Sequence, residues 1–251
     1  MTAFLEALRK VVSSPVLTGE QISEKFQHDW SSELPGMPVA VVRPDSTLEV
    51  AAIMTLCASH EQPVVIQGGL SGLCGGANPR SNELAISMER LSGIEEIDAA
   101  SMTMTVKAGT PLQVIQEAAA AAGFVFPLDL GARGSCNIGG NIATNAGGNQ
   151  VLRFGMTRNL VLGLEAVLAD GTVISAMNKM LKNNAAYDLK HLFIGTEGTL
   201  GIVTRAVLRL YPKANSRCSA LLAFDNFPAV IEVMQRLSRD FGGALSAFEV
   251  M

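Results

Sequence analysis

Two glycine-rich segments hold the residues of this sequence whose types and spacing best suit ligand binding. The first glycine loop is QGGLSGLCGG at 67–76, and the second is PLDLGARGSCNIGGNIATNAGG at 127–148. A diphosphate is bound by backbone N–H groups that approach it closely, and glycine has no Cβ to block that approach. The first loop lacks both the GK[ST] ending of a P-loop and the G-x-G-x-x-G spacing of a Rossmann turn. Its composition therefore indicates phosphate binding of another kind.

The second glycine loop interleaves its glycines with serine, asparagine and threonine, and only Asp129 and Arg133 are charged. Small neutral donors and acceptors suit the polar edge of a flat aromatic ring, while Leu128, Ile138 and Ile142 suit its apolar face. Together the loops predict a cradle for a large, flat, phosphorylated ligand. Two other interpretations stay open on the residues alone: a mobile surface loop for the first segment and a glycine-rich array of turns for the second.

The histidines and cysteines lack the spacing of a metal site. His28, His60 and His191 show no HxH or HxxxH arrangement, and the four cysteines include no CxxC pair. We therefore expect no metal, no disulfide framework and a reducing compartment. His60 ends an expected helix, where an interaction with the helix C-terminus is its more natural role.

Composition and charge argue against two classes of partner. The 251 residues are 48% hydrophobic and 17% charged, with a formal net charge of −4 at pH 7. Nucleic acid is disfavoured because its phosphates attract clustered Lys and Arg. No apolar run reaches the roughly 18 residues of a membrane-spanning helix, and residues 2–12 resemble an amphipathic helix rather than a signal peptide. We expect a soluble, cytoplasmic protein.

A strand–helix–strand pattern positions the first glycine loop. Ser46 and Glu49 have the spacing of a capping box, which predicts a helix over 47–60. Its apolar positions Val50, Ile53, Met54 and Cys57 fall on one face. An apolar run at 63–66 predicts a strand that ends at the loop, and further short strands are expected at 83–87, 94–98 and 102–107.

A helix and a hairpin flank the second glycine loop. Thr110 as cap, Pro111 at the first helical position and Gly123 as stop predict a helix through residue 122. The Ala-Asp-Gly sequence at 169–171 predicts a hairpin between strands at 161–168 and 172–176. The remaining expected elements are a short helix at 187–193, a strand at 202–211, and a strand, helix and strand at 218–224, 228–240 and 244–250.

Five motifs, in the same order, resemble the FAD-linked D-2-hydroxyacid dehydrogenases, most closely those of the 2-hydroxyglutarate type. They are the two glycine loops, VLGLEAVLADGTV, YDLKHLFIGTEGTLGI and LSAFEVM. These enzymes belong to the vanillyl-alcohol-oxidase/PCMH flavoprotein superfamily, and the resemblance covers about residues 35–251. It implies an α+β fold: a PCMH-type FAD-binding domain of two α/β subdomains, followed by the first β-α-β unit of an incomplete cap domain.

The resemblance also implies a division of the chain and a set of cofactor contacts. The expected parts are an N-terminal helical segment at 1–34, FAD-binding subdomains at 35–100 and 101–215, and the start of a substrate domain at 216–251. The first loop would bind the FAD diphosphate, the second would line the isoalloxazine and ribityl chain, and the GTEGTLGI segment would meet the adenosine end. The implied cofactor-binding residues are Gly68, Gly69, Leu70, Ser71, Gly72, Gly75, Pro127, Asp129, Gly134, Ser135, Gly139, Gly140, Thr144, Asn145, Gly148, Glu197, Gly201 and Ile202.

We expect FAD to be held noncovalently, although some relatives attach the flavin through a histidine or cysteine. Cys74 and Cys136 lie inside the loops, where the expected role is that of a small buried thiol. Glu197 taken alone would be a helix cap or a surface carboxylate. In the resembling enzymes the substrate-binding cations, a histidine metal cluster and the base lie in the cap domain and the C-terminal segment, so no catalytic or metal-binding residue is assigned in this chain. Arg133 is a candidate for tuning the flavin, with a solvated loop cation as the equal alternative.

Three functional hypotheses follow. The leading one is the FAD-binding portion of an oxidoreductase that oxidises a D-2-hydroxy acid, of the 2-hydroxyglutarate or lactate type, to the 2-oxo acid by hydride transfer to flavin N5. The second is a non-catalytic FAD-binding subunit completed by a partner chain, as in glycolate oxidase. The third is a binding module that has kept the fold and lost the flavin. Expected partners are a small 2-hydroxy acid and an unidentified electron acceptor, with a homodimer or a partner subunit both open.

Overall fold

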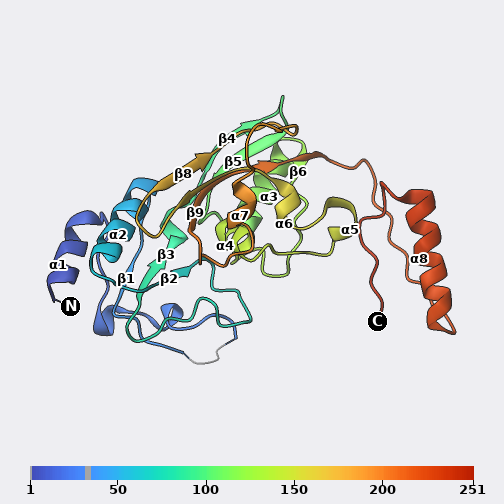
Figure 1. Cartoon of the computed structure of the whole chain (residues 1–251). Helices are drawn as coiled ribbons and strands as arrows, with labels where there is room; N and C mark the ends of the chain where they lie inside the picture. The colour runs from blue at the N-terminus through green and yellow to red at the C-terminus, as the bar shows by residue number, and fades with distance from the viewer. Residues whose placement is uncertain (1, 32–34) are drawn as a thin grey trace.

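The computed structural model describes residues 2–31 and 35–251, and the two larger of the three sheets in these residues form one mixed α+β body (Figure 1). The smaller sheet has three parallel strands in the order β1-β3-β2. These strands are β1 (Ala40–Val42), β3 (Leu84–Ser87) and β2 (Val64–Gln67). The first glycine loop leaves the carboxyl end of β2, which is the edge where open parallel sheets place their ligands.

Helix α2 (Thr47–Ser59) packs on this sheet, and its start forms only half of the predicted capping box. The Ser46 side chain accepts from the backbone N–H of Glu49 at 3.3 Å, as predicted. The Glu49 carboxylate does not return to Ser46; it accepts from the N–H of Asp45 at 2.9 Å and from that of Ser13. Glu49, the second residue of the motif, therefore connects the start of α2 to Ser13, which follows the N-terminal helix. The predicted buried face is confirmed for Val50, Ile53, Met54 and Cys57.

The larger sheet has five antiparallel strands in the order β4-β5-β9-β7-β8. They are β4 (Ile94–Asp98), β5 (Thr103–Lys107), β9 (Ile202–Arg209), β7 (Val161–Val167) and β8 (Val173–Ala176). The predicted hairpin is confirmed, with Gly171 in its turn at φ +88°. Strand β4 precedes residue 100, yet it pairs with β5 across the boundary expected between the two subdomains.

Short helices and loops surround the larger sheet and include the second glycine loop. Helix α3 (Leu112–Ala121) begins one residue later than predicted, because Pro111 is its N-cap and the Thr110 hydroxyl instead donates to the Lys107 carbonyl at 2.6 Å. Gly123 follows the helix at φ +82°, as a stop requires. The helix expected at 187–193 is shorter. The other elements are α1 (Thr2–Val11), 3₁₀ turns at Gly19–Gln21, Glu24–Phe26 and Met88–Arg90, β6 (Phe124–Val125), α4 (Ile138–Ala143), α5 (Val151–Phe154), α6 (Thr157–Leu160), α7 (Lys190–Phe193) and β10 (Tyr211–Pro212).

The two sheets share a core at one end. Val167 at the end of β7 and Ile202 at the start of β9 are buried in the cluster that also contains Val50, Ile53 and Ile86 of the smaller half. Burying one such aliphatic side chain stabilises a fold by about 1.5–3 kcal/mol. The ends of β7 and β9 therefore hold the two halves together.

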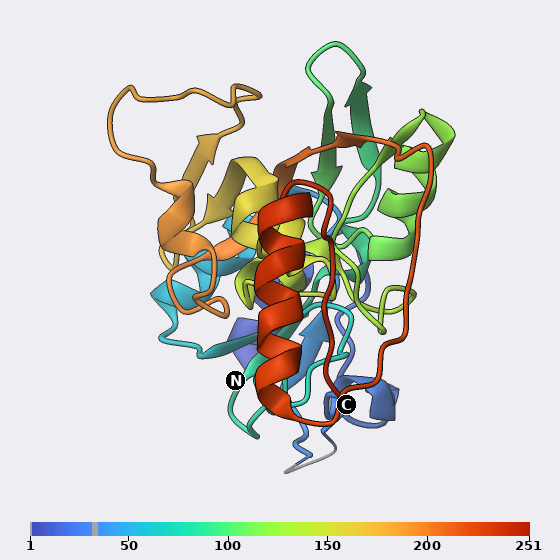
Figure 2. The same ribbon diagram turned by 90° about the vertical axis from the view of Figure 1, so that its right-hand side faces the viewer.

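The residues after β10 form one helix rather than the predicted β-α-β unit. Helix α8 (Phe227–Phe241) begins after Asn226, whose side chain accepts from the N–H of Ala229 at 3.0 Å. The segments at 218–224 and 244–250 are not strands, because a strand needs a neighbour for its backbone groups and no described strand pairs with them. Helix α8 stands apart from both sheets in Figure 1, and Figure 2 looks onto it from that side. None of the helices in 2–31 or 35–251 has the length and apolar character to cross a membrane.

Candidate functional site

The two glycine loops pack against each other at the edge where β2 ends. A Cβ added to Gly69 would lie 1.9 Å from the carbonyl oxygen of Ser135, far inside contact distance. Gly68 has more room, and a Cβ there would meet its nearest neighbour, Gly140, at 3.7 Å. The backbones of the two loops therefore approach each other at Gly69 and Ser135 at a distance that only glycine permits. Two loops that are distant in the sequence thus form one continuous surface.

The GTEGTLGI segment closes onto the end of the second glycine loop. The backbone N–H of Gly195 donates to the Ile142 carbonyl at 3.1 Å, and that of Glu197 donates to the Ala143 carbonyl at 2.9 Å. A Cβ on Gly76 would come within 3.1 Å of the Glu197 carboxylate, so the first loop meets this segment as well. The structure thus brings together all three segments that the sequence singled out.

Two cavities open along this junction. The larger, of about 680 Å³, lies between β2, the end of the first glycine loop and residues 197–202. The smaller, of about 440 Å³, lies at the start of the first loop. Of the predicted cofactor residues, Gly75, Glu197, Gly201 and Ile202 line the larger cavity, and Gly68, Gly69, Leu70 and Ser135 line the smaller. The predicted residues that line neither are Ser71, Gly72, Pro127, Asp129, Gly134, Gly139, Gly140, Thr144, Asn145 and Gly148.

The first glycine loop carries unpaired backbone donors between the two cavities. In the part of the chain that the structure describes, none of the N–H groups from Gly69 to Ala77 donates a hydrogen bond. Residues at the start of this loop line the smaller cavity, and residues at its end line the larger one. Successive free N–H groups after a parallel strand are the arrangement that binds phosphate oxygens. The loop therefore fits a diphosphate.

The second glycine loop, by contrast, is held by hydrogen bonds both within itself and to the chain around it. The N–H of Gly139 donates to the Ala108 carbonyl at 2.7 Å. Gly148 is packed so tightly that a Cβ would fall 2.0 Å from the Asp129 carbonyl oxygen. The Asn141 side chain is buried, and its Oδ1 has no partner among the described residues. This loop is a fixed wall with a buried acceptor, whereas the first loop supplies donors.

Each of the three segments contains one non-glycine residue with a left-handed backbone. These are Leu70 at φ +54°, Asn145 at +48° and Glu197 at +53°. Such conformations cost on the order of 1–3 kcal/mol each, and they persist only where the surroundings impose them, most often at functional sites. The same conformation also occurs at Glu61, Met102 and Ala186, outside these segments, so it accompanies the candidate site without identifying it.

Arg158 is a residue that the sequence did not single out. Its guanidinium donates to the His191 carbonyl at 2.8 Å and to the Ile194 carbonyl, while its backbone N–H donates to Asn145 Oδ1 at 2.9 Å. It therefore braces the third segment against the end of the second loop. Burial lowers the pKa of the His191 ring, which lies 3.2 Å from this guanidinium. The sequence carries no signal for Arg158, because its acceptors are backbone carbonyls of a distant segment.

The remaining candidate groups in the two loops are one arginine and two cysteines, and they differ in their exposure. Arg133 is exposed and lines neither cavity, and its influence on a flavin stays a prediction. Cys136 is buried, and that burial raises the pKa of its thiol. Cys74 is exposed and lines the larger cavity, so the expectation of a buried thiol is wrong there, because no element covers this glycine-rich turn.

The His60 ring contacts the Leu56 carbonyl at 3.0 Å, which confirms its place at a helix end. No group of His, Cys, Asp and Glu among the described residues could hold a metal ion.

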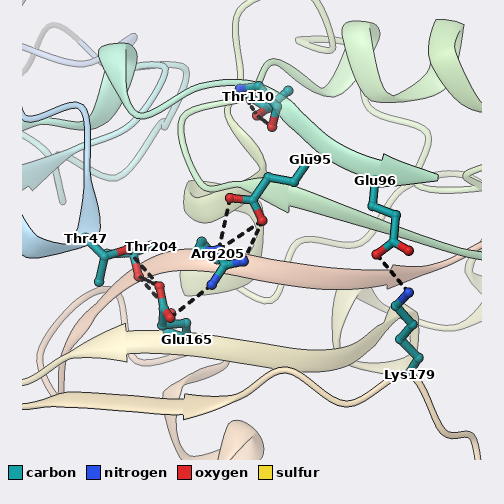
Figure 3. Close-up of polar contacts among 9 residues, drawn as sticks. Thr47, Glu95, Glu96, Thr110, Glu165, Lys179, Thr204 and Arg205 are labelled. Carbon is teal, nitrogen blue, oxygen red and sulfur yellow. Dashed lines mark hydrogen bonds and ion pairs between the residues drawn. The ribbon is translucent and has the colours of Figure 1, made fainter. Parts of the chain in front are cut away.

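A buried carboxylate links the two halves of the fold (Figure 3). Glu165 on β7 accepts from the hydroxyls of Thr47, which starts α2, at 2.7 Å and of Thr204 on β9 at 3.0 Å. Its other oxygen lies 3.2 Å from the Arg205 guanidinium, which also pairs with Glu95 at 2.7 Å. The strand registers shift at Glu95 and at Thr204, and such bulges re-aim side chains. The network therefore connects the start of α2 to strands β4, β7 and β9.

Comparison with known proteins places this chain among flavin-binding domains. A family model described as an FAD binding domain matches residues 38–176. The chain is 40% identical to the mitochondrial D-2-hydroxyglutarate dehydrogenase of Bos taurus, over 98% of this chain and 45% of that protein. It is 42% identical to the D-2-hydroxyglutarate dehydrogenase of Xanthomonas citri, over 90% and 48%. It is 37% identical to the glycolate oxidase subunit GlcD of Bacillus subtilis, over 83% and 44%.

The solved structure of an alkyldihydroxyacetonephosphate synthase matches 96% of this chain and 46% of that protein, with a TM-score of 0.81 at 20% identity. This likeness shows a shared fold, and the expected α+β fold with a PCMH-type FAD-binding domain is confirmed. The chain spans about half the length of the curated relatives it matches.

Proposed function

This chain belongs to the FAD-binding domain family, and from that premise we propose that it holds FAD noncovalently as the cofactor-binding portion of a D-2-hydroxyacid oxidoreductase. Bound FAD would supply the hydride acceptor that oxidises the hydroxy acid to the 2-oxo acid. A substrate of the 2-hydroxyglutarate type is favoured, because relatives of 40% and 42% identity carry that name. Lactate-type acids are the alternative substrates.

The observation that carries this proposal is the row of unpaired N–H groups between two cavities. Residues 69–77 would bind the diphosphate oxygens, since no other group in the described chain uses these donors. The larger cavity, lined by Glu197, Gly201 and Ile202, would take the adenosine end. The second loop would form the rigid wall beside the flavin and exclude water from it. The proposal assigns no proton-transfer residue to this chain.

Absorbance spectroscopy of the purified protein tests this function. We expect flavin bands, and we expect acid precipitation to release FAD, identified by chromatography, into the supernatant. A colourless protein that takes up no added FAD would refute the proposal and favour a binding module without flavin. Flavin that stays with the precipitated protein would contradict noncovalent binding.

A second function is an FAD-binding subunit completed by a partner chain. It is favoured by the likeness to a protein named as a glycolate oxidase subunit, and by the exposed apolar side chains of Leu221, Phe227 and Ile231 around α8. Anaerobic addition of D-2-hydroxyglutarate, D-lactate or glycolate separates the two functions. Bleaching by the chain alone would exclude a need for a partner, whereas bleaching only after a partner chain is added would support the subunit.

We also place the protein in the cytoplasm. This proposal is supported by its four free cysteines, because thiols stay reduced in that compartment. Cell fractionation followed by immunoblotting tests it, and recovery in a membrane or secreted fraction would contradict it.

A further inference from the structure

Residues 25–30, here called the N-terminal strap, lie against the first glycine loop. Lys25, His28, Asp29 and Trp30 line the smaller cavity together with the start of that loop. The strap precedes the region matched by the family model, which begins at residue 38. The walls of the candidate cofactor site therefore extend beyond the part of the chain by which the family is recognised.

Gln67 connects the strap to the loop. Its side chain is fully buried, at 0% exposed, and its amide nitrogen donates to the Phe26 carbonyl at 2.8 Å and to the Ala77 carbonyl at 3.0 Å. The second bond joins the two ends of the glycine loop, and the first fastens that closed base to the strap. The Gln67 amide thus fixes the distance between the two ends of the loop and holds the loop against the strap.

Asp29 makes the second connection. It is 2% exposed, and its backbone N–H donates to Asn78 Oδ1, just beyond the loop, at 2.6 Å. Its carboxylate accepts from the Ser31 hydroxyl at 2.5 Å, and a Cβ on Gly72 would come within 3.3 Å of its other oxygen. The Asp29 carboxylate therefore lies beside the middle of the loop, while its backbone N–H holds Asn78, which follows the loop.

The loop needs this support because it does not hold its own shape. Its N–H groups from Gly69 to Ala77 make no hydrogen bonds within the described chain, and Leu70 has a left-handed backbone. A strained segment without internal bonds keeps one conformation only when its surroundings impose it. Ligand donors must in turn be held in place to bind well.

We propose that the N-terminal strap is a working part of the cofactor site, in which Gln67 and Asp29 are positioning residues that keep the first glycine loop in its diphosphate-binding shape. This inference rests on the proposed FAD function. Neither residue was among those expected to touch the cofactor, and both act through the loop backbone.

Gln67→Leu and Asp29→Ala test the strap, with FAD affinity and hydrogen–deuterium exchange as the two measurements. Gln67→Leu keeps the size of the side chain and removes both donated bonds, and it should raise the Kd for FAD about tenfold or more. In the FAD-saturated protein, where the cofactor would protect these N–H groups, exchange should accelerate at 68–77 and stay unchanged at 138–146. A merely structural role would instead accelerate exchange throughout the small sheet.

Gln62→Leu is the matched control at the other end of β2. The Gln62 amide also donates to two carbonyls, those of Pro63 at 2.9 Å and Asn82 at 2.7 Å, but it lies away from the loop. This variant should bind FAD as the wild type does. Asp29→Asn retains an oxygen that accepts from Ser31, and it should restore most of the affinity lost in Asp29→Ala. It also keeps the test decisive if Gln67→Leu does not fold.

The two proposals can fail separately. If the wild-type protein takes up no FAD, the proposed function fails. If the wild type binds FAD, and Gln67→Leu and Asp29→Ala bind it within about twofold of wild type with unchanged exchange at 68–77, the strap inference is overturned while the function stands. Equal losses in Gln62→Leu and Gln67→Leu would overturn it as well.

Discussion

Replacing Gly69 with alanine should force the two glycine loops apart. The added Cβ would lie 1.9 Å from the Ser135 carbonyl oxygen, 2.7 Å from its carbon and 2.8 Å from Cys136 Cα. All three are backbone atoms, so no change of rotamer relieves the overlap. A carbon–oxygen contact is comfortable at about 3.3 Å, so the loops must separate by about 1.4 Å, the difference between 3.3 and 1.9 Å.

The size of the effect follows from what surrounds Ser135. Overpacking a close-packed region costs about 1–3 kcal/mol, and the upper half of that range applies because the neighbouring Cys136 is anchored in the core. Each kcal/mol lowers the melting temperature of a chain of this size by about 2–4 °C, so we expect a fall of about 4–12 °C. FAD affinity should fall at least about tenfold, because a displacement of about 1 Å is enough to misplace binding groups.

Scanning calorimetry of the FAD-free protein and FAD titration measure the two effects. Gly68→Ala is the matched control: its Cβ would meet nothing closer than 3.7 Å, so its melting temperature should stay within about 2 °C of wild type. The reasoning is refuted if Gly69→Ala melts with the wild type. It is also refuted if both variants lose the same stability, since the close approach would then be irrelevant.

Other perturbations probe the site from different sides. Gly140→Ala adds a Cβ that meets no atom within 4 Å, so it should leave the melting temperature unchanged yet weaken FAD binding in a titration; an unaltered Kd would argue against a flavin beside Gly140. Maleimide labelling should modify exposed Cys74 and Cys218, and FAD should slow it only at Cys74, which lines the larger cavity; equal protection of both would contradict that placement. Burial raises the pKa of Cys57 to about 12, so raising the pH to about 9 should leave its labelling as slow as at pH 7 when read by mass spectrometry; faster labelling would contradict that burial. Glu165→Ala removes the carboxylate that accepts from the Thr47 and Thr204 hydroxyls and pairs with Arg205. The free energy of unfolding, measured by urea denaturation, should fall by about 2–3 kcal/mol. A fall of less than about 1 kcal/mol would show that the network contributes no more than an exposed ion pair.

The local elements were largely predictable from the sequence. The helix after Ser46, the hairpin around Gly171 and the stop at Gly123 all follow from interactions between residues a few positions apart. The expected β-α-β unit after residue 212 was wrong in its strands, because a strand depends on a neighbour that its own residues do not supply. The helix of that unit, whose hydrogen bonds are internal, was predicted correctly.

What the sequence determined by itself is the character of the candidate site: glycine-rich loops whose composition suits a phosphorylated ligand, within motifs that resemble a flavin-binding family. What only the tertiary structure decided is how those loops are held. The 1.9 Å approach at Gly69, the amide of Gln67 across the loop and the guanidinium of Arg158 all join segments far apart in the chain. Such contacts depend on distances between backbones, which no local pattern encodes. A residue's type shows what it can bind, whereas the folded chain alone brings its partner within reach.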